Sequence, residues 1–453
     1  MSTSPAYQVT DPATGEVVET FEPATDADVE AALTAAAAAY ATWKDVPITR
    51  RAEIVSKVGA LFAERADELA AIAAQEMGKP VSEGVGEVEF CQAIFDYFAT
   101  EGPTLAADQP IKTFSGGKAV VQKLPIGALL GIMPWNFPFY QIARFAAPNL
   151  MLGNTIILKH AESVPRSALA VEQIMKDAGV PEGAYVNLFA THEQIETIIA
   201  DPRVQGVSLT GSERAGAIVA SLAGKYLKKC VLELGGSDPY VILDSDDVAE
   251  AAETAWGTRM YNMGQACNSN KRMIVMHDIF DDFVSELTRK ALAIEPGSFA
   301  PMSSRAAAET LAAQVDDAVS KGATLHAGGV LSDAPAAYYS PAVLTGVTPD
   351  MRAYSEELFG PVAVVYKVGS DEEALELAND TQYGLGGAVF STDVDRATSV
   401  ASLLETGMAN VNTPAGEGAE VPFGGVKRSG FGRELGPLGM DEFVNKRMFF
   451  VAD

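Results

Sequence analysis

Apolar and polar positions follow two different patterns along this chain. In the first hundred residues the pattern is helical. Thr25 and Asp28 have the spacing of a capping box and precede an alanine-rich stretch at 29–41. A second helical stretch covers residues 50–77 and stops before Gly78. Further along, short apolar runs alternate with helical segments, which predicts an α/β fold with parallel sheets covered by helices.

The alternating part divides into two sets, which predict two Rossmann-like α/β domains. In the first set we expect strands at 127–133, 155–159, 185–189 and 204–210, and helices at 163–178, 191–200 and 213–223. In the second set we expect strands at 230–234, 240–243 and 272–276, and helices near 246–261 and after 278. The stretch 111–124 fits neither set and resembles a protruding hairpin, and 448–451 reads as an edge strand able to pair with another chain.

Composition narrows the class of protein. The 453 residues exceed one ordinary domain, and no run approaches the roughly 18 apolar residues that span a bilayer. A formal charge of −27 disfavours nucleic acid and anionic membranes as partners. Three cysteines form no disulfide framework, no secretory signal is visible, and the four histidines form no metal-binding pair. We therefore expect a cytoplasmic protein without a metal.

A cysteine and a glutamate are the first candidates for chemistry. Cys267 follows a predicted helix and precedes a predicted strand, and a thiolate is the best side-chain nucleophile. The alternative for a single cysteine is a small buried apolar residue. Glu233 ends a predicted strand, where ligands bind in α/β sheets, and two glycines after it permit close backbone approach. The alternative is a solvated glutamate in a turn.

Three further strings lie at predicted strand ends. In the string 134–138 (PWNFP), two prolines fix Asn136, whose amide can donate to an oxyanion; a rigid turn around Trp135 is the alternative. The string 210–212 (TGS) precedes a helix whose free N–H groups can hold a phosphate. Lys159 and Glu162 can contact a ribose or a phosphate, or can be ordinary exposed charges.

Taken together, these strings resemble the aldehyde dehydrogenase superfamily. The resemblance covers about residues 8–450 and rests on PWNFP, TGS, ELGG (233–236), GQAC (264–267), EELFGPV (356–362) and PFGGVKRSGFGRELG (422–436). The interval 267 − 233 = 34 also matches the family.

The resemblance implies a mechanism with a covalent intermediate. Cys267 attacks the aldehyde to give a thiohemiacetal, and Asn136 and the Cys267 N–H hold its oxyanion. Hydride transfer to NAD or NADP leaves a thioester, which water activated by Glu233 hydrolyses. Glu434 is a candidate for assisting proton removal. The implied cofactor-binding residues are Trp135, Lys159, His160, Glu162, Gly211, Ser212, Leu234, Glu357 and Phe359.

Substrate and cofactor choice rest on fewer residues. The short chain and Lys159-His160-Ala161 resemble a branch rich in succinate semialdehyde dehydrogenases, in which Arg144 takes the place of an arginine that binds the substrate carboxylate. Tyr261 stands where some of these enzymes have a second arginine, and Phe423 is the third candidate substrate residue. Glu417 and Glu420 would be unfavourable near a carboxylate, so a neutral aliphatic or aromatic aldehyde is the alternative substrate. The charge of Glu162 favours NAD, whereas relatives with the Lys-His-Ala pattern often use NADP.

The resemblance also implies an organisation of the chain. Residues 1–106 and 126–231 form a dinucleotide-binding domain, 232–430 a catalytic domain, and 107–125 with 431–453 a small β element for oligomerisation. We expect a homodimer or homotetramer that acts on a small-molecule aldehyde. A non-catalytic protein with the same fold is a further alternative, which the intact set of Cys267, Glu233 and Asn136 disfavours.

Overall fold

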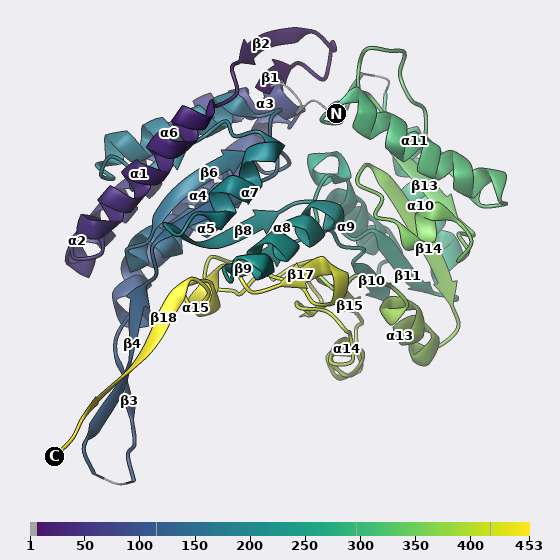
Figure 1. The fold of residues 1–453 in the computed structure, drawn as a ribbon. Helices are drawn as coiled ribbons and strands as arrows, with labels where there is room; N and C mark the ends of the chain where they lie inside the picture. Colours follow the sequence, from purple (N-terminus) through teal and green to yellow (C-terminus); the bar gives the residue numbers. More distant parts are fainter. Residues whose placement is uncertain (1–6, 115, 296, 417) are drawn as a thin grey trace.

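Two α/β units and a protruding three-stranded arm make up the fold (Figure 1). The computed structural model describes residues 7–114, 116–295, 297–416 and 418–453, so Glu417 lies outside the described residues. A short hairpin of β1 (Tyr7–Thr10) and β2 (Val17–Phe21) precedes the first unit. The predicted α/β class is confirmed.

The first unit is built on a six-stranded sheet in the order β17-β9-β8-β5-β6-β7, parallel except where β17 meets β9. Its strands are β5 (Ala128–Met133), β6 (Thr155–His160), β7 (Tyr185–Asn187), β8 (Val204–Thr210), β9 (Lys229–Glu233) and β17 (Gly430–Phe431). Successive residues face opposite sides of a strand, and Leu129 and Leu130 accordingly pack into two different cores. Because both faces are buried, these strands are continuous apolar runs in the sequence.

Helices cover both faces of this sheet. They are α1 (Asp26–Trp43), α2 (Ile48–Glu64), α3 (Ala66–Met77), α4 (Val81–Leu105), α5 (Tyr140–Leu152), α6 (Pro165–Ala178), α7 (His192–Ala200) and α8 (Glu213–Lys225). The capping box predicted at Thr25 and Asp28 is confirmed. The prediction of one helix over 50–77 is wrong, because Arg65 leaves the helical conformation (φ −106°, ψ 19°) and separates α2 from α3. Helix propensity is high on both sides of Arg65, so the break has no signal in the sequence.

The second unit is built on a seven-stranded sheet in the order β12-β13-β14-β11-β10-β15-β16, parallel except between β12 and β13. Its strands are β10 (Pro239–Ile242), β11 (Arg272–Met276), β12 (Thr324–Ala327), β13 (Ala342–Thr345), β14 (Val362–Val368), β15 (Ala388–Phe390) and β16 (Asn410–Val411). Its helices are α9 (Val248–Met260), η1 (Tyr261–Gly264), α10 (Phe280–Leu292), α11 (Arg305–Ser320), α12 (Arg352–Ser355), α13 (Asp371–Asn379) and α14 (Val394–Ala401).

One predicted strand belongs to the other sheet. We expected 230–234 to begin the second set, but β9 pairs in parallel with β8 and is part of the first sheet. An apolar run shows that a segment is a buried strand, but not which sheet it joins. The consequence matters for function, because Glu233 thereby ends a strand of the first sheet while the chain crosses to the second.

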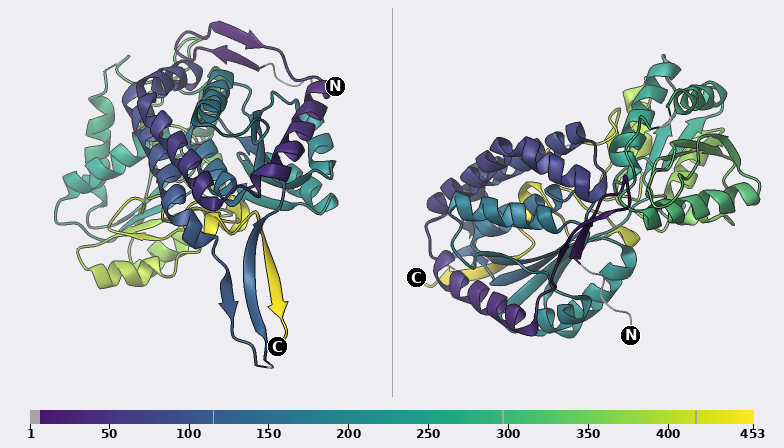
Figure 2. Two further views of the ribbon diagram at one scale, coloured as in Figure 1. Left: turned by 90° about the vertical axis from the view of Figure 1, so that its left-hand side faces the viewer. Right: turned by 90° about the horizontal axis from the view of Figure 1, so that it is seen from above.

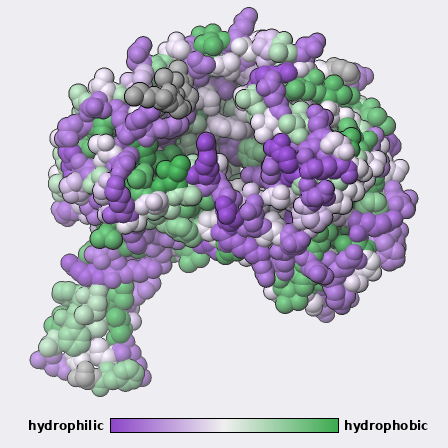
Figure 3. Space-filling view, turned by 45° about the vertical axis from the view of Figure 1, so that its right-hand side comes forward, coloured by the Kyte–Doolittle hydropathy of each residue, from purple (hydrophilic) through white to green (hydrophobic). Residues whose placement is uncertain are grey.

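The arm is formed by segments far apart in the sequence. Strand β4 (Lys118–Pro125) pairs with β3 (Gln109–Ile111) on one side and with β18 (Val444–Val451) on the other, all antiparallel. It projects from the body (Figure 2), and apolar side chains gather on it (Figure 3). The hairpin predicted at 111–124 and the strand predicted at 448–451 are confirmed. Within the described ranges no helix has the length and apolar character needed to cross a membrane.

Candidate active site

Cys267 lies on the loop between η1 and β11, at the wall of a cavity of about 970 Å³. After α9 the chain turns sharply, because Asn262 and Met263 adopt left-handed conformations (φ 50° and 52°). Gly264 follows with φ 70°, and a Cβ atom there would collide with the carbonyl group of Gly360. This turn requires a glycine, and it brings the cysteine to the cavity.

The cavity wall is largely apolar, and residues of both units contribute to it. Tyr261 and Phe423, two of the predicted substrate residues, line the cavity. Other lining residues are Phe90, Phe137, Tyr140, Met408 and Leu438. Arg433 also lines it and adds a positive charge that the sequence analysis did not single out.

Asn136 is tied to the loop that carries the nucleophile. It is buried between β5 and α5, and its Nδ2 donates to the carbonyl oxygen of Gln265 at 3.0 Å, two residues before Cys267. Its own carbonyl accepts from the Asn262 side chain at 2.9 Å. The amide is therefore held rigidly beside the thiol segment, as an oxyanion donor must be.

His160 supports the Asn136 loop from behind. The fully buried ring donates from Nε2 to the Pro138 carbonyl at 2.9 Å, and its Nδ1 accepts from the Ala161 N–H at 2.9 Å. Burial lowers the pKa of His160 to about 4, so the ring is neutral at physiological pH. Both ring nitrogens are thus engaged within the protein, and the structure places His160 behind the loop rather than at a cofactor surface.

Glu233 is a buried carboxyl group at the end of β9. Neither of its oxygens has a hydrogen-bond partner among the described residues. Burial raises the pKa of Glu233 well above its usual range, the nearby Arg144 guanidinium lowers it, and Glu434 raises it. A carboxyl group with a raised pKa and unused oxygens has the properties of a general base that works near neutral pH.

Arg144 lies behind the cavity wall and is fully buried. It forms an ion pair with Glu434 and donates to Thr210 Oγ1 at 3.1 Å. Its guanidinium also packs 4.5 Å from the centre of the Phe423 ring and 5.0 Å from that of Tyr140, and both rings line the cavity. The structure therefore brings Arg144 against the site but gives it an acidic partner within the protein.

Most predicted cofactor residues meet at the carboxyl edge of the first sheet. Trp135 follows β5, Lys159 and Glu162 are at the end of β6 and just beyond it, and Gly211 follows β8. These strands are neighbours in the sheet, and ligands bind at this edge in α/β folds. The Lys159 Nζ is 2.5 Å from a Glu162 oxygen.

The start of α8 completes this edge. Ser212 caps the helix by accepting from the Ala215 N–H at 3.3 Å, and a Cβ atom at Gly211 would meet nothing closer than 3.7 Å. Leu234 packs under the helix at Gly216, where a Cβ atom would lie 2.7 Å from its methyl groups. The open backbone at a helix start suits a pyrophosphate group, so these residues fit a dinucleotide.

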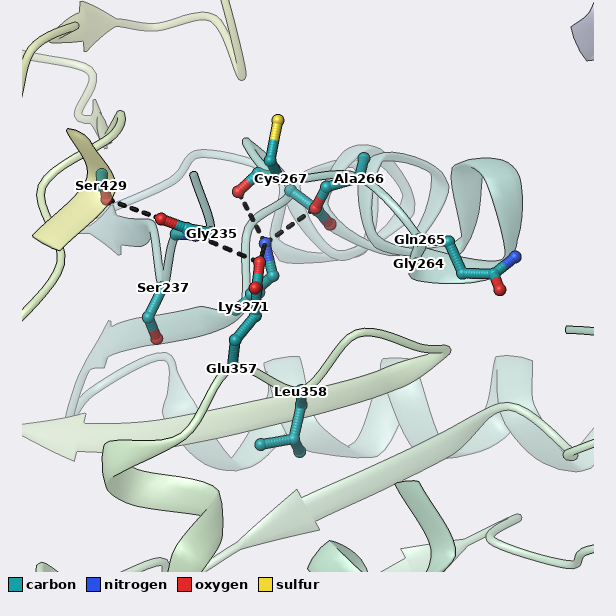
Figure 4. Close-up of polar contacts among 12 residues, drawn as sticks. Gly235, Ser237, Gly264, Gln265, Ala266, Cys267, Lys271, Glu357, Leu358 and Ser429 are labelled. Carbon is teal, nitrogen blue, oxygen red and sulfur yellow. Dashed lines mark hydrogen bonds and ion pairs between the residues drawn. The ribbon is translucent and has the colours of Figure 1, made fainter. Parts of the chain in front are cut away.

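Glu357 and Phe359 approach the nucleophile loop from the second unit. Glu357 Oε1 accepts from the Gly236 N–H at 3.1 Å and lies 3.0 Å from Lys271 Nζ (Figure 4). Phe359 meets Trp135 edge to face, with ring centres 5.8 Å apart. A Cβ atom at Gly235 would collide with Glu357, so the glycines after Glu233 serve the close approach that their sequence predicts.

The Cys267 thiol is protonated in the resting protein. Burial raises the pKa of Cys267 to about 11; Arg144 and Lys271 lower it, whereas Glu357 and Asp238 raise it. A thiol of this kind needs a proton acceptor or added positive charge before it attacks a carbonyl group.

The sequence reasoning missed Tyr140, Arg433 and Lys271. Tyr140 and Arg433 stand beside predicted residues in the 134–138 and 422–436 strings, so closer reading of those strings could have found them. Lys271 follows Cys267 by four residues and has no signal of its own. Among the described residues no cluster of three or more potential metal ligands is found.

Comparisons with known proteins agree with this geometry. A family model described as "Aldehyde dehydrogenase family" matches residues 1–449. A succinate-semialdehyde dehydrogenase [NADP(+)] of Deinococcus radiodurans is 52% identical over 98% of this chain and 94% of its own length. A succinate-semialdehyde dehydrogenase [NADP(+)] of Mycobacterium avium is 41% identical over 97% of this chain and 96% of its own length. The crystal structure of succinic semialdehyde dehydrogenase from Streptococcus pyogenes in complex with NADP+ superimposes with a TM-score of 0.95 at 40% identity, covering 99% of this chain and 100% of that one.

Proposed function

The chain belongs to the aldehyde dehydrogenase family, and we propose that it oxidises succinate semialdehyde to succinate with Cys267 as the nucleophile. The observation that carries this proposal is the placement of Cys267 on a cavity wall, beside an amide that is bonded to its own loop. The names of the relatives in Deinococcus and Mycobacterium support the choice of substrate.

The chain's own residues account for the steps on either side of hydride transfer. The Cys267 thiol loses its proton, for which Glu434 is the candidate acceptor, as its sulfur adds to the aldehyde carbon. The Asn136 amide and the Cys267 N–H donate to the resulting oxyanion. A bound nicotinamide ring supplies a hydride acceptor. Glu233, once deprotonated, takes a proton from the water that attacks the thioester, which releases the acid and regenerates the thiol.

We propose that Trp135, Lys159, Glu162, Gly211, Ser212, Leu234, Glu357 and Phe359 bind the dinucleotide, and that His160 supports them indirectly. NADP is the preferred cofactor in this proposal, and NAD is the alternative. The names of the relatives support NADP. The negative charge of Glu162 opposes binding of a 2′-phosphate. Two side chains can offset that charge, because its carboxylate lies 2.5 Å from Lys159 and 3.0 Å from His192.

We propose two arginines for the substrate carboxylate. Arg144 packs behind two aromatic rings of the cavity wall. Described residues engage three of its N–H donors. A guanidinium has five such donors, so two are left for a substrate carboxylate. Arg433 lines the same cavity. The apolar wall favours the second candidate, a dehydrogenase of neutral aliphatic or aromatic aldehydes, with Tyr261 and Phe423 contacting the substrate.

The remaining proposals concern the whole protein. We propose that a dinucleotide-binding domain is formed by residues 1–106 and 126–231. We propose that a catalytic domain is formed by residues 232–430, and the chain crosses from the first domain to the second after β9. The arm (107–125 and 431–453) is proposed to join copies into a homodimer or homotetramer, because exposed apolar side chains occupy its edge strand β18. A cytoplasmic location is proposed from the three free cysteines.

The test measures reduced cofactor by absorbance, with NAD and NADP each crossed against succinate semialdehyde, butanal and benzaldehyde. The best pair is repeated with Arg144→Met and Arg433→Met. The ratio of kcat/KM for succinate semialdehyde to that for butanal cancels any loss of folded enzyme. We expect this ratio to fall at least about tenfold in one or both variants, as loss of a charged contact requires. An unchanged ratio in both variants, or preference for a neutral aldehyde, would remove the substrate assignment.

A further inference from the structure

Lys271 is a buried ammonium group, only 2% exposed, whose donors all have acceptors in the active-site region. Its Nζ donates to the carbonyl oxygens of Ala266 and Cys267 at 2.7 Å each and lies 3.0 Å from Glu357 Oε1 (Figure 4). An ammonium group has three N–H donors, and three acceptors surround it. Burying such a charge is costly unless it is fully paired, so this arrangement leaves it little freedom to move.

The three acceptors belong to segments that must come together for the reaction. Ala266 and Cys267 form the nucleophile loop, and Glu357 comes from the second unit just before β14. Glu357 in turn holds the Gly236 N–H in the turn after Glu233, and a Cβ atom at Gly236 would lie 2.7 Å from the Cys267 carbonyl oxygen. One lysine therefore links the nucleophile, the turn beside the base, and an acidic residue at the nicotinamide side.

We propose that Lys271 is a positioning residue for the nucleophile: it fixes the Cys267 peptide, binds Glu357 to the same loop, and supplies a positive charge on the backbone side of the cysteine. The Cys267 side chain points away from the ammonium group (Figure 4), so Lys271 acts through the backbone and through its charge. This inference rests on the proposed function, since it takes Cys267 to be the nucleophile of the reaction.

Two residues near Cys267, Lys271 and Glu357, shift the pKa of its thiol in opposite directions. The charged or titratable groups that act on the thiol are Arg144, Lys271, Glu357, Asp238 and Tyr140. Lys271 lowers the pKa of Cys267 and Glu357 raises it. Removing the lysine charge must therefore raise this pKa, and removing the glutamate charge must lower it. If the two substitutions only disturbed the local structure, they would not be expected to shift the pKa of Cys267 in opposite directions.

The experiment follows alkylation of Cys267 by iodoacetamide against pH, without cofactor or substrate, and reads the modified peptide by mass spectrometry. In Lys271→Met we expect alkylation at a given pH to slow by about tenfold, because one unit in pKa is a factor of ten in thiolate. In Glu357→Gln we expect alkylation to accelerate. In Lys271→Arg, which keeps the charge, the pH profile should return toward that of the parent protein.

Two controls keep these results interpretable. Cys230, a half-buried cysteine on β9, serves as the internal reference for folding, and Lys367→Met removes an exposed lysine from β14. Equal alkylation of Cys267 in Lys271→Met and the parent, or slowing in both Lys271→Met and Glu357→Gln, would overturn the proposal. If Lys271→Met does not fold, the test rests on Glu357→Gln. The proposal is then overturned if Cys267 is alkylated no faster in Glu357→Gln than in the parent protein. Because no turnover is required, failure here is distinct from failure of the proposed function.

Discussion

Removing the Arg144 charge should destabilise the folded protein more than most single substitutions do. Arg144 is 0% exposed and its partner Glu434 is 5% exposed, so Arg144→Met leaves a carboxylate buried without its ion pair. One hydrogen bond from Ser208 Oγ, at 3.2 Å, remains to that carboxylate. Breaking a buried ion pair from one side typically costs about 3–5 kcal/mol. We expect the free energy of unfolding to fall by about that amount.

A double variant separates the ion pair from the loss of packing. In Arg144→Met with Glu434→Gln both charges are gone, and replacing a buried pair as a whole is often nearly neutral. We therefore expect the double variant to be more stable than Arg144→Met, with a coupling energy above about 1 kcal/mol. As a control, Arg65→Met breaks a half-exposed pair with Asp177, which should cost no more than about 1 kcal/mol.

The assay is urea unfolding followed by tryptophan fluorescence, with all variants at one protein concentration because self-association adds apparent stability. The three tryptophans lie in both units, so unfolding of either unit changes the signal. A loss below about 1 kcal/mol in Arg144→Met, or a coupling energy within about 0.5 kcal/mol of zero, would show that Arg144 is not committed to Glu434.

Three further predictions concern catalysis. Asn136→Ala should lower kcat by about 10²–10³-fold, as loss of an oxyanion donor does, and steady-state kinetics with unchanged cofactor affinity would support that role. Glu162→Gln should raise the ratio of NADP to NAD affinity by about tenfold, since it removes a negative charge from the proposed 2′-phosphate site; fluorescence titration of both cofactors measures this, and an unchanged ratio contradicts it. Because the pKa of Glu233 is raised by burial, hydrolysis of the thioester should increase as pH rises through that elevated pKa, and a pH-independent single-turnover rate of hydrolysis would exclude Glu233 as the base.

The sequence predicted best what depends on local pattern. Strands β5, β6, β8 and β11 lie within a residue or two of their predicted bounds, because uninterrupted apolar runs fill positions buried on both faces. The membership of β9 in the first sheet depends on its pairing with β8, a long-range contact that no local pattern encodes. The break at Arg65, where φ is −106° and ψ is 19°, likewise has no counterpart in helix propensity.

The candidate site shows the same division. Cys267, Glu233 and Asn136 were identifiable because each lies in a string with unusual glycine or proline spacing. The inward position of His160, with both ring nitrogens bonded, depends on a loop from another strand and could not be predicted from its neighbours in sequence. Lys271 was also missed, because Glu357 is far from it in the sequence and reaches it only when the second unit is folded.

Trapping the thioester tests the central claim most directly. In Glu233→Gln the first half-reaction should proceed and hydrolysis should be slower by about 10²–10⁴-fold, the usual contribution of a general base. Mixing this variant with NADP and succinate semialdehyde should give one equivalent of NADPH per active site, and acid quenching followed by peptide mass spectrometry should find a succinyl group on Cys267 and none in Cys267→Ala. An acyl group on Cys91 or Cys230, or a burst of NADPH without any protein adduct, would contradict the account.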